Sequence, residues 1–238
     1  MKYVGVDGCR IGWLAVSLTD HNVDVAVFTC FDNLWAAHED AITILVDIPI
    51  GLASGNQTPR QADLLARQML GSRRSTLFLP SVREVLGCDS YAEACETNRR
   101  LTGKKISKQY WHIMPKIKAV DVFLQTTPIA MKTVRESHPE LCFGLASSST
   151  VRFSKKTSEG LRERLDVLHK YISNVDDIYE TSLRKHLRKE VARDDIVDAL
   201  MLAVTAREAG GALKPLPDPP ESDETGLDMA IWYHDFGK

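Results

Sequence analysis

The sequence predicts an α/β fold built around a mixed β-sheet, and three features lead to this expectation. Residues 2–29 contain three short apolar segments separated by turn residues. A fourth segment, residues 42–49, is apolar almost throughout. Much of the remaining chain has apolar residues at helical spacing, as expected where helices cover a sheet.

The N-terminal part is expected to form an antiparallel meander that leads into a parallel strand. Gly8 and Gly12 mark a tight connection between the first two strands, because glycine tolerates the positive φ that hairpin loops require. A continuous apolar run such as residues 42–49 is typical of a central parallel strand covered on both faces. Strands are expected at residues 2–7, 13–18, 23–29 and 42–49, and a helix at residues 31–39.

Residues 54–128 are expected to form a helical insertion after the fourth strand. Their helical periodicity is interrupted by glycine and proline, and no segment has a convincing strand pattern. From Pro59 to Lys118 the chain carries twelve Lys and Arg residues against five Asp and Glu, although its formal net charge is −2. This excess predicts either a solvated helical surface or an anion-binding face. Helices are expected at residues 61–70, 90–101 and 107–124.

The C-terminal part is expected to complete the sheet and to add a helix packed deep in the protein. Residues 193–206 have apolar side chains on nearly all sides, as a buried helix does. The proline-rich run of residues 215–220 is expected to lack regular structure. Further strands are expected at residues 131–136 and 229–233, and a helix at residues 161–171. We expect one domain over residues 1–238 that carries the insertion.

Carboxylates stand at three places where a charge is costly. Asp7 ends the first apolar strand, and Asp47 lies within the apolar run of the fourth. Asp194, Asp195 and Asp198 open the apolar helix, and their spacing of three and four residues places them on one face. Acidic residues also cap the first turn of a helix, so for this cluster alone capping is the simpler interpretation.

Taken together, the aspartates predict a metal site. Parallel strands bring their carboxyl ends to one edge of a sheet, where Asp7 and Asp47 would meet. Two divalent ions about 3.5–4 Å apart need hard oxygen ligands from several elements, and Mg²⁺ or Mn²⁺ would offset the repulsion between them. The expected metal ligands are Asp7, Asp47, Asp194, Asp195 and Asp198. The expected catalytic residues are Asp7, Asp47, Asp195, Asp198 and Glu136, where Glu136 is alternatively a surface acid paired with Arg135.

Four runs of the sequence, residues 4–13, 46–52, 136–140 and 194–200, resemble the proteins called domain of unknown function 429. Shorter matches at residues 71–75, 155–157 and 231–233 extend the resemblance over nearly the whole chain. Members of that family are predicted nucleases of the ribonuclease H fold. The resemblance therefore implies a ribonuclease H-like mixed five-stranded sheet in the order 3-2-1-4-5, flanked by helices, and it implies a nuclease.

The layout of acids is also similar to that of the junction-resolving branch of the ribonuclease H-like proteins. That branch places one acid on the first strand, one on the fourth and a D-x-x-D pair on the final helix. This chain departs from that branch in the Ile48-Pro49 that follows the middle acid and in the large helical insertion. The matching positions are Asp7, Asp47, Asp195 and Asp198.

A nuclease must also hold phosphate groups, which Arg and Lys side chains bind well. For each basic residue considered alone, the alternative is a solvated or salt-bridged surface side chain. Nucleic acid is therefore the expected partner, and the sequence defines no oligomeric state. The candidate phosphate-binding residues are Arg10, Arg73, Arg74, Lys155 and Lys156.

The expected function is a metal-dependent nuclease that hydrolyses phosphodiester bonds of nucleic acid by a two-metal-ion mechanism. One alternative is a non-catalytic protein on the same fold that binds nucleic acid or a nucleotide. Another is a phosphotransferase of the actin and sugar-kinase type, although such enzymes need two lobes of this kind. The sequence has neither a P-loop nor a dinucleotide-binding glycine motif.

Cysteine usage and hydropathy suggest a cytoplasmic protein. The five cysteines are odd in number and contain no C-x-x-C pair, which argues against a disulfide framework and a structural zinc site. No apolar run approaches the roughly 20 residues needed to cross a bilayer, and the N-terminus lacks the pattern of a signal peptide. We expect no association with a membrane.

Overall fold

The computed structural model describes residues 1–20, 22–55, 59–147 and 151–237. The chain divides into two compact units. Unit 1 comprises Met1–Asp47, Lys132–Lys214 and Trp232–Lys238, and unit 2 comprises Ile48–Met131 and Pro215–Ile231. The expectation of a single domain stays a prediction.

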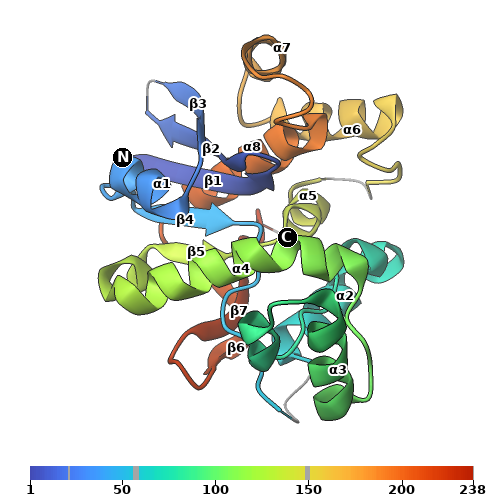
Figure 1. Cartoon of the computed structure of the whole chain (residues 1–238). Coiled ribbons are helices and arrows are strands. Elements are labelled where there is room, and N and C mark those ends of the chain that lie inside the picture. The colour runs from blue at the N-terminus through green and yellow to red at the C-terminus, as the bar shows by residue number, and fades with distance from the viewer. Residues whose placement is uncertain (21, 56–58, 148–150, 238) are drawn as a thin grey trace. The chain divides into compact units, whose positions relative to one another are not determined.

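Unit 1 contains the predicted mixed sheet. Its strands are β1 (Lys2–Cys9), β2 (Gly12–Thr19), β3 (Val23–Phe28), β4 (Thr43–Val46) and β5 (Val134–Glu136). They lie side by side in the order β3-β2-β1-β4-β5, which confirms the predicted order (Figure 1). The first three strands pair antiparallel, whereas β4 pairs parallel with both β1 and β5.

The helices of unit 1 are α1 (Phe31–His38), α5 (Pro139–Ala146), α6 (Ser158–Leu168), α7 (Val175–Lys185) and α8 (Arg193–Ala209). Helix α8 packs against β1, β2 and β4, and residues 196–206 are all buried, as the sequence predicted.

Helices α5 and α7 were not predicted. Helix α5 is only eight residues long and almost entirely apolar, so it shows little periodicity. The buried positions of α7 are Val175, Tyr179 and Ser182, and the polar member weakens the apolar pattern.

Unit 2 contains the helical insertion. Its helices are α2 (Gln61–Leu70), α3 (Tyr91–Thr102) and α4 (Lys108–Thr126), with short 3₁₀ helices η1 (Gly71–Thr76), η2 (Arg83–Gly87) and η3 (Pro128–Lys132). Among the described residues between β4 and β5 there is no strand, as expected. None of the helices in the described part of the chain combines the length and apolar character needed to cross a membrane.

A separate two-stranded sheet corrects one expectation. Strand β6 (Lys214–Ser222) pairs with β7 (Asp228–Tyr233), so the prediction that the proline-rich run lacks regular structure was wrong. Each strand of a two-stranded sheet has an unpaired edge, and an edge strand tolerates proline where the missing N–H faces away from the partner. Pro215, Pro217, Pro219 and Pro220 all lie within β6. The strand expected at residues 229–233 is confirmed.

A buried ion pair lies at the start of α2 in unit 2. The side chains of Arg60 and Asp63 are 2% and 1% exposed. Arg60 Nε donates to Asp63 Oδ2 at 3.0 Å, and Arg60 Nη2 donates to Asp63 Oδ1 at 2.7 Å. Arg60 Nη1 donates to the carbonyl oxygens of Ile50 and Gly51, each at 2.9 Å. Both carboxylate oxygens of Asp63 therefore accept a hydrogen bond from the guanidinium.

Candidate metal centre

The strand ends of the sheet place Asp7 beside Asp47. The parallel pairing of β1 with β4 runs as far as Val6 opposite Val46. The next residue along β1 is Asp7, and the next after β4 is Asp47, whose backbone N–H donates to the carbonyl oxygen of Val6 at 3.0 Å. The two carboxylates thus lie at the ends of neighbouring strands, at the same edge of the sheet, as the sequence predicted for parallel strands.

Gly5 allows α8 to approach this edge closely enough to bring Asp198 to it. Residues 5 and 7 point to the same face of β1, because side chains alternate along a strand. A Cβ atom at Gly5 would lie 2.1 Å from the Ala199 carbonyl oxygen and 2.2 Å from the Ala203 nitrogen. The backbone of α8 therefore rests directly on β1, with Asp198 next to the point of contact.

Asp7, Asp47 and Asp198 form an acidic centre. Each offers a carboxylate oxygen, and the three oxygens lie within 4.8 Å of one another. Asp7 Oδ1 accepts a hydrogen bond from the Gly8 N–H at 2.6 Å. Asp198 is fully buried, and its Oδ1 has no hydrogen-bond partner among the residues that the structure describes. A buried carboxylate oxygen without a donor is costly, so this atom points to a missing positive ligand.

Burial and mutual repulsion raise the pKa of all three carboxyl groups. Burial raises the pKa of Asp7 well above its ordinary value, and the charges of Asp47 and Asp198 add to the effect. Burial and the neighbouring Asp198 raise the pKa of Asp47 to about 7. Burial raises the pKa of Asp198 to about 6, although Lys155 acts in the opposite direction. The raised pKa values show that the negative charges of the three carboxylates are not balanced by nearby positive charge.

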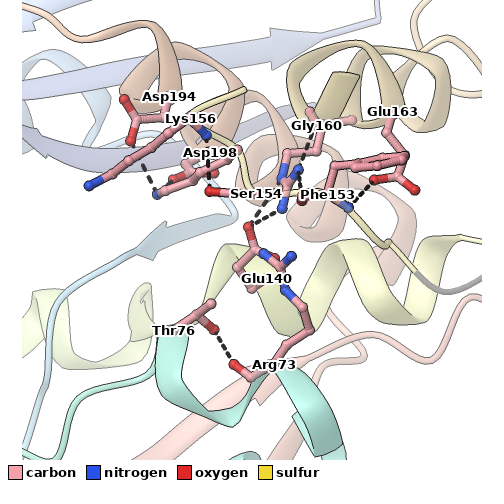
Figure 2. A network of polar contacts seen from close by, with 12 residues as sticks. Arg73, Thr76, Glu140, Phe153, Ser154, Lys156, Gly160, Glu163, Asp194 and Asp198 are labelled. Carbon is pink, nitrogen blue, oxygen red and sulfur yellow. Dashed lines mark hydrogen bonds and ion pairs between the residues drawn. The ribbon is translucent and has the colours of Figure 1, made fainter. Parts of the chain in front are cut away.

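Lys155 supplies one positive charge to this centre. Its ammonium donates to Asp198 Oδ2 and lies 3.7 Å from Asp194 Oδ2. Burial lowers the pKa of Lys155, but the carboxylates of Asp198 and Asp7 outweigh it and raise the pKa overall. Figure 2 shows the Asp194 and Asp198 side chains together on α8, near the segment that carries Ser154 and Lys156. Lys155 was predicted as a phosphate ligand, whereas in this structure it pairs with the acids.

The other two acids at the start of α8 differ in their contacts. Asp195 Oδ2 accepts a hydrogen bond from the Ala192 N–H at 2.8 Å, so Asp195 caps the helix. Burial raises the pKa of Asp195 to about 6, although this hydrogen bond acts in the opposite direction. The capping considered for the whole cluster thus belongs to Asp195, because the third helical residue is the one that reaches back to the N-cap N–H. A metal-binding role of Asp194 or Asp195 stays a prediction.

Two buried glutamates, Glu136 and Glu140, lie close enough to Asp47 to raise its pKa. Glu136 ends β5 opposite Val46 and is 5% exposed, and its charge contributes to the raised pKa of Asp47. Glu136 is therefore not the surface acid considered as an alternative. Glu140 on α5 accepts two hydrogen bonds at Oε1 from the fully buried Arg164, from Nε at 3.1 Å and from Nη2 at 2.5 Å. Sequence reasoning did not identify Arg164, because nothing in the sequence distinguishes it from an exposed helical arginine.

The remaining basic candidates lie on other segments of the chain. Arg10 is exposed in the β1–β2 hairpin of unit 1, and Lys156 is exposed beside Lys155. Arg73 and Arg74 belong to η1 of unit 2. Their expected role in phosphate binding stays a prediction.

Comparison with known proteins gives one finding. A family model described as "Protein of unknown function (DUF429)" matches residues 5–222 of the chain, which confirms the resemblance noted in the sequence. No curated protein and no solved structure matches the chain.

Proposed function

Because the chain belongs to the DUF429 family, whose description names no activity, we propose its function from the acidic centre. We propose a metal-dependent nuclease that hydrolyses phosphodiester bonds of nucleic acid with Mg²⁺ or Mn²⁺. One observation carries the proposal: carboxylate oxygens of Asp7, Asp47 and Asp198 lie within 4.8 Å of one another, and the buried Asp198 Oδ1 has no hydrogen-bond partner in the described part of the chain. The resemblance to ribonuclease H-like nucleases supports it, because it implies acids on these same elements.

The residues present fit a divalent cation with oxygen ligands. Mg²⁺ and Mn²⁺ prefer carboxylate oxygens, and the three aspartates come from three different elements, so they can surround an ion. The structure offers Asp7, Asp47 and Asp198 as the ligands, with Asp194 and Asp195 nearby on α8. When bound in pairs, such ions activate a water molecule and stabilise the departing oxygen of a phosphodiester.

The protein's own residues have three tasks in this proposal. The strand ends and α8 hold the carboxylates in place, which lowers the cost of ordering them when a substrate binds. The buried Glu136 adds a negative charge that acts on Asp47, and negative charge near a carboxylate favours the binding of a cation to it. Arg10 and Lys156, both exposed, are the candidates in unit 1 for holding substrate phosphates.

Nucleic acid is the proposed partner. The positively charged segment from Pro59 to Lys118 lies in unit 2, and positive charge of this density attracts a phosphate backbone. We further propose a cytoplasmic location, which is supported by the five cysteines, all of them free thiols.

The test is cleavage by the purified full chain of single- and double-stranded DNA, RNA, an RNA–DNA hybrid and a four-way junction. We expect cleavage with Mn²⁺ or Mg²⁺ and none with excess chelator. Asp7→Asn should lower the rate by roughly 10²-fold or more, because it removes a charge that holds the metal. The matched control is Asp166→Asn, which removes an exposed carboxylate paired with Arg162 on α6 and should leave the rate unchanged.

Two outcomes would count against the proposal. Cleavage that persists at the wild-type rate in Asp7→Asn would rule out the acidic centre as the active site. Metal-independent binding of nucleic acid without cleavage of any substrate would favour the non-catalytic alternative.

A further inference from the structure

The Lys155 ammonium lies where a cation of the acidic centre is expected. It contacts Asp198 Oδ2, while the other oxygen of the same carboxylate, Oδ1, is buried and has no hydrogen-bond partner within residues 1–20, 22–55, 59–147 and 151–237. It also lies 3.7 Å from Asp194 Oδ2. The acids at the start of α8 therefore offer two separate places for positive charge, and Lys155 takes one of them.

The backbone that carries Lys155 is held firmly in place. The N–H groups of Arg152 and Phe153 donate to the Glu163 carboxylate at 2.9–3.1 Å. A Cβ atom at Gly160 would lie 2.0 Å from the Ser154 carbonyl oxygen, so this loop rests directly on α6. The backbone position of Lys155 is thus set by the fold.

The buried Arg164 also holds the backbone of the loop that carries Lys155. Arg164 Nη1 donates to the carbonyl oxygen of Gly160 at 2.6 Å and to that of Phe153 at 3.3 Å, while its other nitrogens bind Glu140. Figure 2 shows this network, with Glu140, Phe153 and Gly160 labelled. Breaking a buried pair of this kind is strongly unfavourable, so the loop backbone has little freedom.

The Lys155 side chain, in contrast, is able to move. It is 31% exposed, and the four-carbon stem of lysine can change rotamer without any backbone movement. An ammonium on Asp198 Oδ2 occupies that oxygen and repels a divalent ion that would be ligated through it. The ammonium and an ion ligated through that oxygen therefore exclude each other.

We propose that Lys155 occupies one of the two cation positions of the acidic centre, so that a second divalent ion binds only when Lys155 leaves Asp198. The inference rests on the proposed metal site and adds how that site is regulated. The first ion binds beside the seated ammonium, at the unpartnered side of Asp198. The second ion must displace the ammonium, and its apparent affinity is lower for that reason.

The experiment is a Mn²⁺ titration of the full chain, followed by calorimetry and by electron paramagnetic resonance. The wild-type protein should bind one ion tightly and a second at least about tenfold more weakly. Lys155→Met should bind both ions tightly and show the spin coupling of a close Mn²⁺ pair. Lys155→Arg keeps the charge and should retain the weak second site.

Lys156→Met is the matched control, because it removes the same charge from the neighbouring exposed position and should titrate like the wild type. Lys155→Gln is a second neutral variant in case the methionine variant fails to fold. Equal affinities for the second ion in wild type and in the neutral Lys155 variants would overturn the inference, as would a tight second site in Lys155→Arg.

These results separate the inference from the proposed function. If the wild type binds Mn²⁺ but the neutral variants titrate identically, the metal site stands and the inference fails. If the variants titrate as expected but no substrate is cut, the inference about Lys155 stands and the proposed nuclease activity is contradicted. If no variant binds Mn²⁺ at all, both are overturned.

Discussion

The two units bury charge in opposite ways. At the start of α2 in unit 2, each oxygen of the buried Asp63 accepts a hydrogen bond from Arg60, whose remaining donors reach two backbone carbonyls. In unit 1, the carboxylates of Asp7, Asp47 and Asp198 are crowded within 4.8 Å, and Lys155 contacts only one of them within hydrogen-bond distance.

The difference distinguishes a structural use of charge from a functional one. A buried pair whose hydrogen bonds are satisfied is compensated within the protein, so no external ligand is needed. In a cluster with more carboxylates than cations, the carboxylates repel one another in the folded state and so lower its stability. Proteins commonly retain such a loss of stability at sites where a bound ligand relieves the repulsion. The predictions below change one charge at a time in each region.

The largest effect on stability is expected from Arg60→Met. This change leaves Asp63 buried without its partner, which should lower the free energy of unfolding by about 3–5 kcal/mol. Urea unfolding followed by circular dichroism would measure it, and Mn²⁺ should not reduce the loss. The double variant Arg60→Met/Asp63→Leu should recover most of the stability, because it removes both charges. A single variant as stable as the wild type would show that the pair is not structural.

A smaller effect of opposite sign is expected from Asp47→Asn. Removing one of the repelling charges should raise the free energy of unfolding of the metal-free protein by roughly 1–3 kcal/mol at pH 8. The same variant should lose most of the stabilisation that Mn²⁺ gives to the wild type, measured as a shift in melting temperature. If Asp47→Asn lowered the stability of the metal-free protein, Asp47 would be a compensated acid like Asp63.

The smallest difference is expected when the same two proteins are compared in acid. The pKa of Asp47 is about 7 in the folded state against an ordinary 3.8, so between these values the folded state binds more protons than the unfolded state. The destabilisation by Asp47 is therefore absent below pH 3.8 and grows as the pH rises towards 7. Wild type and Asp47→Asn should differ by less than about 1 kcal/mol at pH 4. A difference that is constant from pH 4 to pH 8 would show that Asp47 does not titrate in this range.

Local patterns in the sequence were sufficient for the five strands and for two of the three central acids, whereas the order of the strands followed from the family resemblance. Asp7 and Asp47 each follow an apolar strand, and parallel pairing brings the ends of such strands together whatever the rest of the chain does. The prediction of Asp198 needed a further argument, because a D-x-x-D pair at the start of a helix is also a capping pattern. The all-round apolar character of residues 193–206 indicated that this helix is buried, and burial is what makes its acid costly.

The position of Lys155 could not be predicted in the same way. It depends on a loop that is held by Glu163, Arg164 and Glu140, residues separated from Lys155 by up to fifteen positions in the chain. In the sequence Lys155 and Lys156 are equivalent neighbours, and only the tertiary contacts place one on the acids and leave the other exposed. The β6 strand was missed for a related reason, because the cost of proline in a strand depends on which edge is paired.

Gly5 sets the distance between α8 and β1, and with it the separation between the carboxylates of Asp7 and Asp198. A Cβ atom there would meet the α8 backbone at 2.1 Å, where ordinary contacts are 3.4–4 Å, so any larger residue must push the helix outward by more than an ångström. Asp198 would move with the helix, while Asp7 would stay on the strand. The difference between an opening suited to Mg²⁺ and one suited to a larger ion such as Ca²⁺ is only a few tenths of an ångström in ligand distance. In the proposed metal site, the size of the ion would thus depend on the absence of a side chain at Gly5, a residue that is not itself a ligand.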